Sequence, residues 1–219
     1  MSEHPADVRR MFTERTASYA RFIRAVLYPQ GLRGYFLRAP FLRPGLRVLD
    51  AGCGTGAVTL GLRDALARRG MEPAAMHAFD LTPAMLDRFR RELTRRRLAG
   101  IDLAEADVLQ PETLPAGWGG YDLVVSASML EYVPRDRFVD AVAGIRGHLR
   151  DGGLFVLFIT RRSWLMRPLI GRWWASQLYT ARELLEAFPA AGFATPAFDR
   201  FPWPFRHLDG WGHIVVARR

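Results

Sequence analysis

The sequence contains no lysine and no asparagine, so all 31 of its basic residues are arginines. Because Schiff-base chemistry and a P-loop both require a lysine, neither mechanism is available to these 219 residues. Lysine and asparagine have AT-rich codons, so a GC-rich genome accounts for their absence. We therefore interpret the net charge of +9 as largely compositional, since the arginines are spread along the chain. Nucleic acid ranks low among the expected partners.

Cysteine is also scarce, with Cys53 as its single occurrence, and the five histidines lack a spacing typical of metal ligands. A disulfide within the chain is excluded, and we expect no metal site. No apolar run approaches the roughly 18 residues that cross a bilayer. The first ten residues have no apolar core of a secretory signal. We therefore expect a cytoplasmic protein.

Strand-like and helix-like segments alternate over most of the chain. The expected strands comprise residues 46–51, 76–79, 101–106, 121–127 and 154–159, with shorter strand-like pieces near 197–201 and 213–217. Amphipathic spacing predicts helices between the strands, and also one or two helices from about residue 8 to 37. Repeated βα units predict an α/β fold, with a Rossmann-like, doubly wound and mainly parallel sheet.

Three helix boundaries can be predicted from local signals. Thr82 before a proline predicts the N-cap of one helix, and the capping box Thr180–Glu183 predicts the start of another. A third helix begins near Phe138, and the apolar spacing extends it through Leu149.

The most informative segment is residues 48–57, where a strand signal meets Asp50 and three glycines follow at alternate positions, Gly52, Gly54 and Gly56. Glycines between a strand and a helix let a flat ligand lie directly against the main chain. The same run also fits the glycine fingerprint of nicotinamide and flavin enzymes. A glycine-rich turn with no ligand is the third interpretation.

Three successive predicted strands lead into a carboxylate, namely Asp50, Asp80 and Asp107. The carboxyl ends of parallel strands meet at one edge of an open sheet, where ligands bind. Asp80 suits the two hydroxyls of a ribose, which a dinucleotide also carries. Asp107 suits an adenine amine, and Asp50 suits a cationic ligand better than a pyrophosphate. The set favours a cationic, adenosine-bearing cofactor.

The segment 48–57 resembles the first motif of class I S-adenosylmethionine (SAM)-dependent methyltransferases. Segments 101–108, 121–133 and 149–154 resemble later motifs of that superfamily. The resemblance is closest to the broad type 11 group, which includes ubiquinone and menaquinone biosynthesis C-methyltransferases. It implies seven strands, the last antiparallel. We expect one domain, 1–219, made of an N-terminal helical cap (1–43), a SAM-binding core (46–160) and an aromatic- and arginine-rich lid with C-terminal strands (161–219).

The resemblance also implies SAM as cofactor and a site for each of its parts. The expected contacts are Gly52, Gly54 and Gly56 for the methionine part, Asp80 for the ribose, Asp107 and Val108 for the adenine, Leu81 and Met85 for the adenine face, and Ser126 and Ala127 beneath the sulfonium. Asp50, Ala51 and Cys53 are further expected cofactor-binding residues. Leu81 and Met85 suit plain core positions equally well.

Methyl transfer from a sulfonium mainly requires near-attack geometry, but a hydroxyl or carbon acceptor also needs a general base. The candidate bases are Tyr19, Glu131, Tyr132 and His207. Many relatives carry a histidine where this chain has Tyr132, so the base does not follow from the resemblance. Each candidate also suits a structural role, in helix packing, at the rim of the fourth strand or in a surface loop.

Aromatic residues mixed with arginines occur in two segments, 161–174 and 201–207. They suit a small apolar or planar acceptor with an anionic group, and we expect a methyltransferase for such an acceptor. The same mixture suits core-completing tryptophans, or a membrane surface. The alternatives are therefore a methyltransferase of lipids or quinones at the inner face of the membrane, an RNA methyltransferase, and a SAM-binding protein without catalysis.

Overall fold

The structure is a computed structural model that describes residues 25–162 and 177–219. Within these residues the centre is a seven-stranded sheet in the order β3-β2-β1-β4-β5-β7-β6. The strands are β1 (Arg47–Ala51), β2 (Ala75–Asp80), β3 (Asp102–Glu105), β4 (Tyr121–Ala127), β5 (Leu149–Thr160), β6 (Ala197–Asp199) and β7 (Gly212–Arg218). Strands β1 to β5 pair in parallel, whereas β7 pairs antiparallel with β5 and β6. The predicted Rossmann-like sheet with an antiparallel last strand is confirmed.

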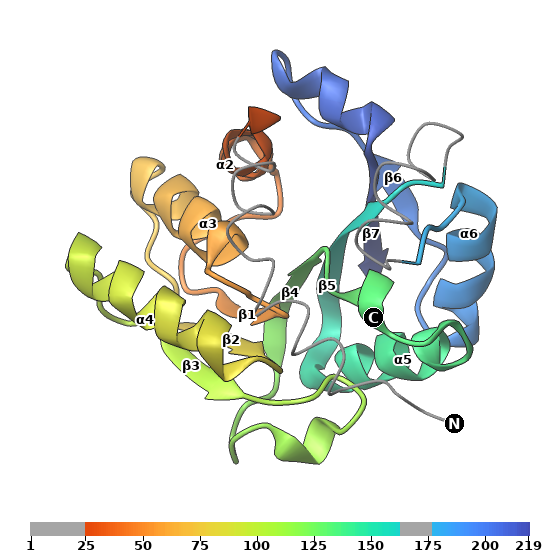
Figure 1. Cartoon of the computed structure of the whole chain (residues 1–219), viewed down its shortest axis with the longest axis horizontal. Coiled ribbons are helices and arrows are strands. Elements are labelled where there is room, and N and C mark those ends of the chain that lie inside the picture. Colours follow the sequence, from red (N-terminus) through yellow and green to blue (C-terminus); the bar gives the residue numbers. More distant parts are fainter. Residues whose placement is uncertain (1–24, 163–176) are drawn as a thin grey trace.

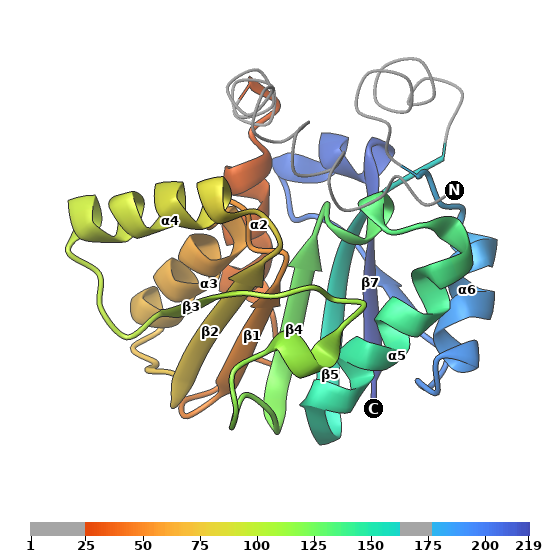
Figure 2. The same ribbon diagram turned by 60° about the horizontal axis from the view of Figure 1, so that its bottom comes forward.

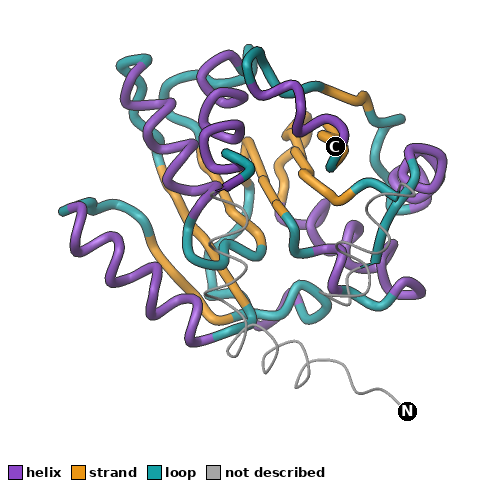
Figure 3. The backbone as a smooth tube through the Cα atoms, turned by 45° about the horizontal axis from the view of Figure 1, so that its top comes forward, coloured by secondary structure: helices purple, strands orange, loops and turns teal. Residues whose placement is uncertain are grey.

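Helices cover both faces of the sheet. Helices α2 (Tyr28–Arg38), α3 (Ala57–Arg68) and α4 (Pro83–Arg96) lie on one face, and α5 (Phe138–His148) and α6 (Ala181–Ala190) lie on the other (Figure 1). Figure 3 shows the same layers, with orange strands between purple helices. The connections contain the short 3-10 helices η1 (Pro111–Thr113), η2 (Leu130–Tyr132), η3 (Arg135–Arg137) and η5 (Phe205–Gly210). Of the helical region expected from about residue 8 to 37, the part before residue 25 lies outside the described residues.

Alternating strand residues belong to buried clusters on opposite faces of the sheet, because successive side chains of a strand point to opposite faces. Leu49 and Val124 belong to the core under α5 and α6, whereas Val48 and Val125 belong to the core under α2 and α3. A sheet covered on both faces needs strands that are apolar throughout. This requirement explains the uninterrupted apolar run of residues 154–159, from which most of β5 was predicted.

One of the three predicted helix boundaries needs correction, and two are confirmed. Leu149 does not end α5; it begins β5 and pairs with Tyr121. Because Leu149 is only 1% exposed, it fitted the apolar spacing of the helix before it. Thr82 occupies the N-cap position of α4, but its side chain makes no capping bond. The capping box of α6 is present, with the Glu183 N–H donating to Thr180 Oγ1 at 3.2 Å.

The order of the strands reverses between β1 and β4. The chain adds β2 and β3 on one side of β1, and then returns to place β4 on the other side. Ligands of open α/β sheets bind beyond the carboxyl ends of the strands at such a point. In Figure 2 the arrowhead of β4 marks this edge at the top of the sheet. The glycine run after β1 and the turn after β4 therefore meet where a ligand is expected.

Two further features bear on function. The antiparallel β7 stands next to β5, where the dinucleotide-binding order 3-2-1-4-5-6 has a parallel strand. This arrangement disfavours the nicotinamide interpretation. Within residues 25–162 and 177–219, no helix has both the length and the apolar character needed to cross a bilayer.

Candidate active site

Asp80, at the end of β2, joins the glycine run to the start of α4. The backbone N–H of Gly54 donates to its Oδ2 at 2.8 Å, and the N–H of Thr82 donates to its Oδ1 at 2.8 Å. Burial raises the pKa of Asp80, and these hydrogen bonds offset part of that increase. A carboxylate offers about four acceptor positions. The carboxylate therefore keeps acceptor capacity for a donor from a ligand.

Asp50 lies in β1, is 1% exposed, and faces the first turn of α3. The N–H of Thr59 donates to Asp50 Oδ2 at 3.0 Å, and the Thr59 hydroxyl donates to the same oxygen. The N-cap residue of α3 is Gly56, which has no side chain, so Asp50 supplies the missing acceptor for the helix start. Its other oxygen, Oδ1, is buried without a hydrogen-bond partner among the described residues. Burial raises the pKa of the Asp50 carboxyl to about 7.

The three glycines of the run have different neighbours, although all have positive φ, at 75° for Gly52, 54° for Gly54 and 87° for Gly56. A Cβ at Gly52 would lie 2.2 Å from Cγ of Met129, and one at Gly56 would lie 2.2 Å from Cε2 of Phe89. A Cβ at Gly54 would meet nothing within 4 Å. Packing therefore requires Gly52 and Gly56, whereas Gly54 faces open space.

Several predicted contact residues have buried side chains. Ala51 is 0% exposed, and Cys53 and Met85 are each 6% exposed. Cys53 packs with Leu86 and Phe89 of α4, and burial raises the pKa of its thiol. These residues can meet a ligand mainly through their backbone atoms. Sequence analysis could not separate this core role from a binding role.

At the end of β4, Ser126 is fully buried and its hydroxyl donates to the carbonyl oxygen of Ala51 at 2.8 Å. This bond joins β4 to β1 at the point where the strand order reverses. Ala127 is half-buried, and Ser128 after it has a φ of 54° that turns the chain away from the sheet. The Ser126 side chain is thus committed to holding the two strand ends together.

Asp107 follows β3 and stabilises its own turn. Its Oδ1 accepts from the N–H of Leu109 at 2.9 Å, and its N–H donates to Thr113 Oγ1 at 3.0 Å. Asp107 and Val108 are half-buried, as is Leu81 after β2. These three residues therefore retain surface that a ligand can reach.

The candidate bases occupy different environments. Glu131, in η2 after β4, is 2% exposed, and burial raises its pKa to about 7. Tyr132 is half-buried beside it. His207 is exposed in η5, with Nε2 3.0 Å from the carbonyl oxygen of Val26. Tyr19 lies outside the described residues. A catalytic role for each of them stays a prediction.

The two aromatic segments are described only in part. In the first, residues 163–174 lie outside the described residues, and Arg161 and Arg162 are exposed. In the second, Phe201 is 2% exposed and its ring lies 5.9 Å from that of Phe158, whereas Trp203 is 77% exposed. Phe201 therefore completes the core, and Trp203 projects into solvent.

Two further residues of the site do not follow from the sequence patterns, namely Thr59, which fixes Asp50, and Met129, which packs against Gly52. A buried polar residue in the first turn after a glycine run is the signal that could have found Thr59. Among the described residues, no group of three or more histidine, cysteine or carboxylate side chains is arranged to hold a metal ion.

The glycine contacts predict unequal costs of substitution. Gly54→Ala and Gly56→Ala both place an alanine at positive φ, but Gly56→Ala also forces a methyl group into the buried ring of Phe89. We expect Gly56→Ala to lose about 1–3 kcal/mol more of the free energy of unfolding than Gly54→Ala. Urea unfolding of the two variants measures this difference. Equal losses would show that Phe89 does not constrain the run.

The buried Asp50 carboxyl predicts a pH dependence. Its folded pKa, about 7, lies above the value near 3.9 of an unfolded chain, so the folded state binds more protons between these values. Its contribution to stability is then lost as the pH rises through 7. Relative to the native chain, Asp50→Asn should gain stability from about pH 4 to 7, by at most about 1.4 kcal/mol per pH unit, and the difference should level off above about pH 7. Urea unfolding at several pH values tests this, and a constant difference would contradict it.

Comparison with known proteins gives a consistent result. Residues 48–153 match a family model described as a methyltransferase domain. The aklanonic acid methyltransferase of Streptomyces sp. (strain C5) is 30% identical over 152 residues, which are 69% of this chain and 64% of that protein. The chloroplastic 2-methyl-6-phytyl-1,4-hydroquinone methyltransferase 1 of Oryza sativa subsp. japonica is 29% identical over 180 residues, which are 78% of this chain and 48% of that protein. The chain thus spans less than two thirds of either relative.

A solved structure extends the similarity over the whole fold. The magnesium protoporphyrin IX methyltransferase of Synechocystis PCC 6803, with bound SAM, has a TM-score of 0.68 at 16% identity and covers 100% of this chain and 98% of that chain. At this identity the likeness shows a shared fold. The family match and the relatives decide between the open interpretations of the glycine run. The chain therefore carries a methyltransferase domain of the SAM-dependent, Rossmann-like class.

Proposed function

We propose that the protein transfers the methyl group of SAM to a small, planar or apolar acceptor by in-line displacement. The observation that carries the proposal is the geometry of Asp80. Its carboxylate is held by the Gly54 and Thr82 N–H groups at the carboxyl edge of the sheet, with acceptor capacity left over. This remaining acceptor capacity suits the hydroxyls of a ribose.

The proposed binding site follows the strand ends from β2 to β4. Asp80 binds the ribose, Asp107 with Val108 and Leu81 binds the adenine, and Gly54 lies against the methionine part. The unpartnered, buried Oδ1 of Asp50 supports a cationic ligand, because a nearby positive charge would favour the ionised carboxylate. The negative charge of a pyrophosphate would disfavour the ionised form of Asp50.

The chain contributes chiefly by positioning the reactants. SAM supplies a methyl group on a positively charged sulfur, which is a good leaving group. Rigid orientation of donor and acceptor lowers such a barrier by roughly 7–11 kcal/mol. Ser126, bonded to Ala51, fixes the floor of the site, and η2 carries Glu131 and Tyr132 beside it. We place any acid–base step at Tyr132, which is half-buried.

We also propose that the cap (1–43), the core (46–160) and the C-terminal part (161–219) act as one domain. Leu32 and Phe36 of α2 share a buried cluster with Val48 of β1, and Tyr179 shares the other cluster with Leu49. These contacts support a cap and a C-terminal part that shape the acceptor side of the site.

The acceptor class rests on the exposed side chains and on the relatives. Arg161 and Arg162 are exposed directly after β5 and suit an anionic group. One relative is named for aklanonic acid and another for a phytyl hydroquinone. These names support a ring-bearing acceptor, with an acidic group in the first case.

Methylation of a quinone or lipid at a bilayer surface is the second candidate. The exposed Trp203 favours it, because tryptophan is suited to the membrane interface. Co-sedimentation with anionic vesicles tests this candidate. Vesicle binding that Trp203→Ala removes supports it, and a protein that stays in the supernatant contradicts it.

The cofactor site predicts selective binding in calorimetry. The native chain should bind SAM and not NADH. Asp80→Ala should weaken SAM binding by roughly 100-fold, since it removes two hydrogen bonds to a charged group. Asp87→Ala, which removes an exposed carboxylate of α4, is the matched control and should bind normally. Binding of NADH without SAM would contradict the proposal.

The acceptor class predicts the outcome of a transfer assay with methyl-labelled SAM. A polycyclic hydroxyaromatic carboxylic acid should receive the label, and its methyl ester should be a poorer acceptor because it lacks the anion. A long-chain hydroquinone in vesicles tests the second candidate, and bulk RNA tests the alternative raised by the positive charge. Label in RNA alone would contradict both small-molecule proposals.

A further inference from the structure

Glu131 bonds to two chain segments that are distant in sequence. Its Oε2 accepts from the N–H of Thr160 at 2.9 Å, where β5 ends. Its backbone carbonyl accepts from the N–H of Gln177 at 2.7 Å, where the chain returns toward α6. Glu131 therefore holds two segments in place, the end of β5 at Thr160 and the chain before α6 at Gln177.

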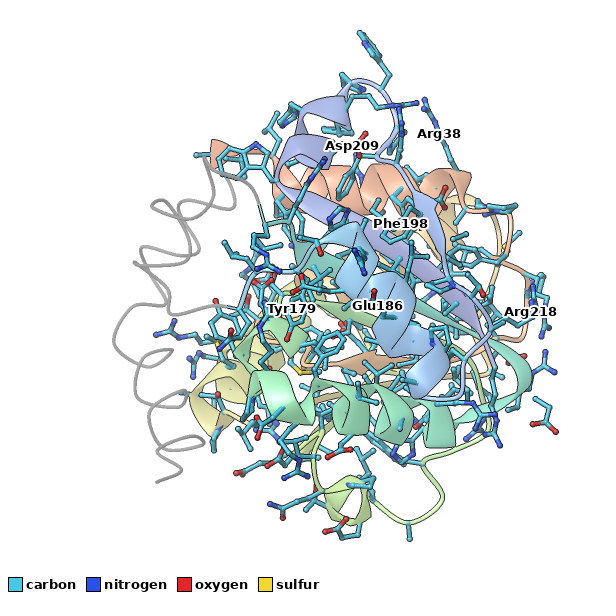
Figure 4. All side chains as sticks on the ribbon, turned by 90° about the vertical axis from the view of Figure 1, so that its right-hand side faces the viewer. Arg38, Tyr179, Glu186, Phe198, Asp209 and Arg218 are labelled. Carbon is cyan, nitrogen blue, oxygen red and sulfur yellow. The ribbon has the colours of Figure 1, made fainter. Side chains whose placement is uncertain are left out.

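The two segments also bond to each other, through residues 160–162 after β5 and Tyr179 before α6. The N–H of Arg162 donates to the carbonyl oxygen of Tyr179 at 2.9 Å, and the N–H of Tyr179 donates to that of Thr160 at 3.3 Å. Figure 4 shows Tyr179 at the end of the sheet opposite to Arg218. Because Thr160, to which Tyr179 bonds, is the last residue of β5, Tyr179 lies at the carboxyl edge.

A cluster of exposed ion pairs joins the same two segments. Arg135 and Arg162 both pair with Oε1 of Glu183, the former at 3.0 Å. Arg135 also donates to the carbonyl oxygen of Leu178 at 2.8 Å and lies 4.8 Å from the ring centroid of Tyr179. Exposed ion pairs of this kind contribute little to stability and weaken in salt. The buried bond from Glu131 is therefore the firmer attachment.

The burial of Glu131 argues against its use as a general base. A base must come within hydrogen-bond reach of the proton it removes. Glu131 is 2% exposed, and Oε2 is already bonded to Thr160. Burial raises the pKa of Tyr179, and the nearby charge of Glu131 adds to that increase. These contacts suit a group that fixes the backbone.

We propose that Glu131 is a positioning residue that holds Arg161 and Arg162 at the carboxyl edge, where they recognise an anionic group of the acceptor. Both arginines follow Thr160 directly, and they are exposed. Phe158, three residues before Arg161, pairs with Ala127 at the end of β4. The two cations thus stand beyond the edge at which the domain binds its ligands. This inference rests on the proposed function.

The test compares Glu131→Ala with Glu131→Gln, which keeps an oxygen able to accept from the Thr160 N–H. Glu131→Ala should speed amide exchange at Thr160 and raise the KM of an anionic acceptor, each roughly tenfold, as expected for one lost hydrogen bond. SAM binding should change less than about twofold, because the variant leaves the Asp80 contacts intact. Glu131→Gln should restore both values. Glu186→Ala, which removes an exposed glutamate of α6, is the matched control (Figure 4).

Two outcomes would overturn the inference. If Glu131→Gln is as inactive as Glu131→Ala with unchanged KM, and the pH–rate profile loses its acidic limb, Glu131 acts as a base. If both variants lose SAM binding and thermal stability together, its role is structural only. Amide exchange at Thr160 and Gln177 needs no turnover, so it still tests the positioning role if the native chain proves unable to bind SAM.

Discussion

The arrangement of the site depends on one interaction, the pair of hydrogen bonds that Asp80 receives from the backbone of Gly54 and Thr82. These bonds connect the ends of two neighbouring parallel strands through the loop after β1 and the start of α4. They fix the glycine run without any side chain from the run itself. Gly54 can then keep its outer side open, while Gly52 and Gly56 pack tightly against Met129 and Phe89.

A second carboxylate, Asp50, caps the helix that follows the glycine run. A helix that starts after glycines has unsatisfied N–H groups and no side chain to cap them. Asp50 reaches from β1 to Thr59 and supplies the cap, at the cost of complete burial. One of its oxygens remains without a partner among the described residues. The same residue therefore stabilises the helix start and retains negative potential for a cationic ligand.

Sequence patterns predicted the sheet well because apolar runs and strand-end carboxylates are local signals. They failed where tertiary contacts decide the role. Leu149 has the spacing of a helix, but pairing with Tyr121 makes it part of β5. No sequence pattern shows that the N–H of Thr160 donates to the buried Glu131 carboxylate, and the predicted role of Glu131 as a base stays a prediction. Spacing likewise could not distinguish Gly54, which faces open space, from the two packed glycines.

The most direct measurement is a crystal structure of the protein with S-adenosylhomocysteine. The account predicts both ribose hydroxyls within about 2.6–3.2 Å of the Asp80 carboxylate, with the amino acid part of the ligand against Gly54. It also predicts that the hydrogen bonds from Gly54 and Thr82 to Asp80 persist. A ligand bound away from the carboxyl ends of β1 and β2, or a ribose with no contact to Asp80, would contradict it.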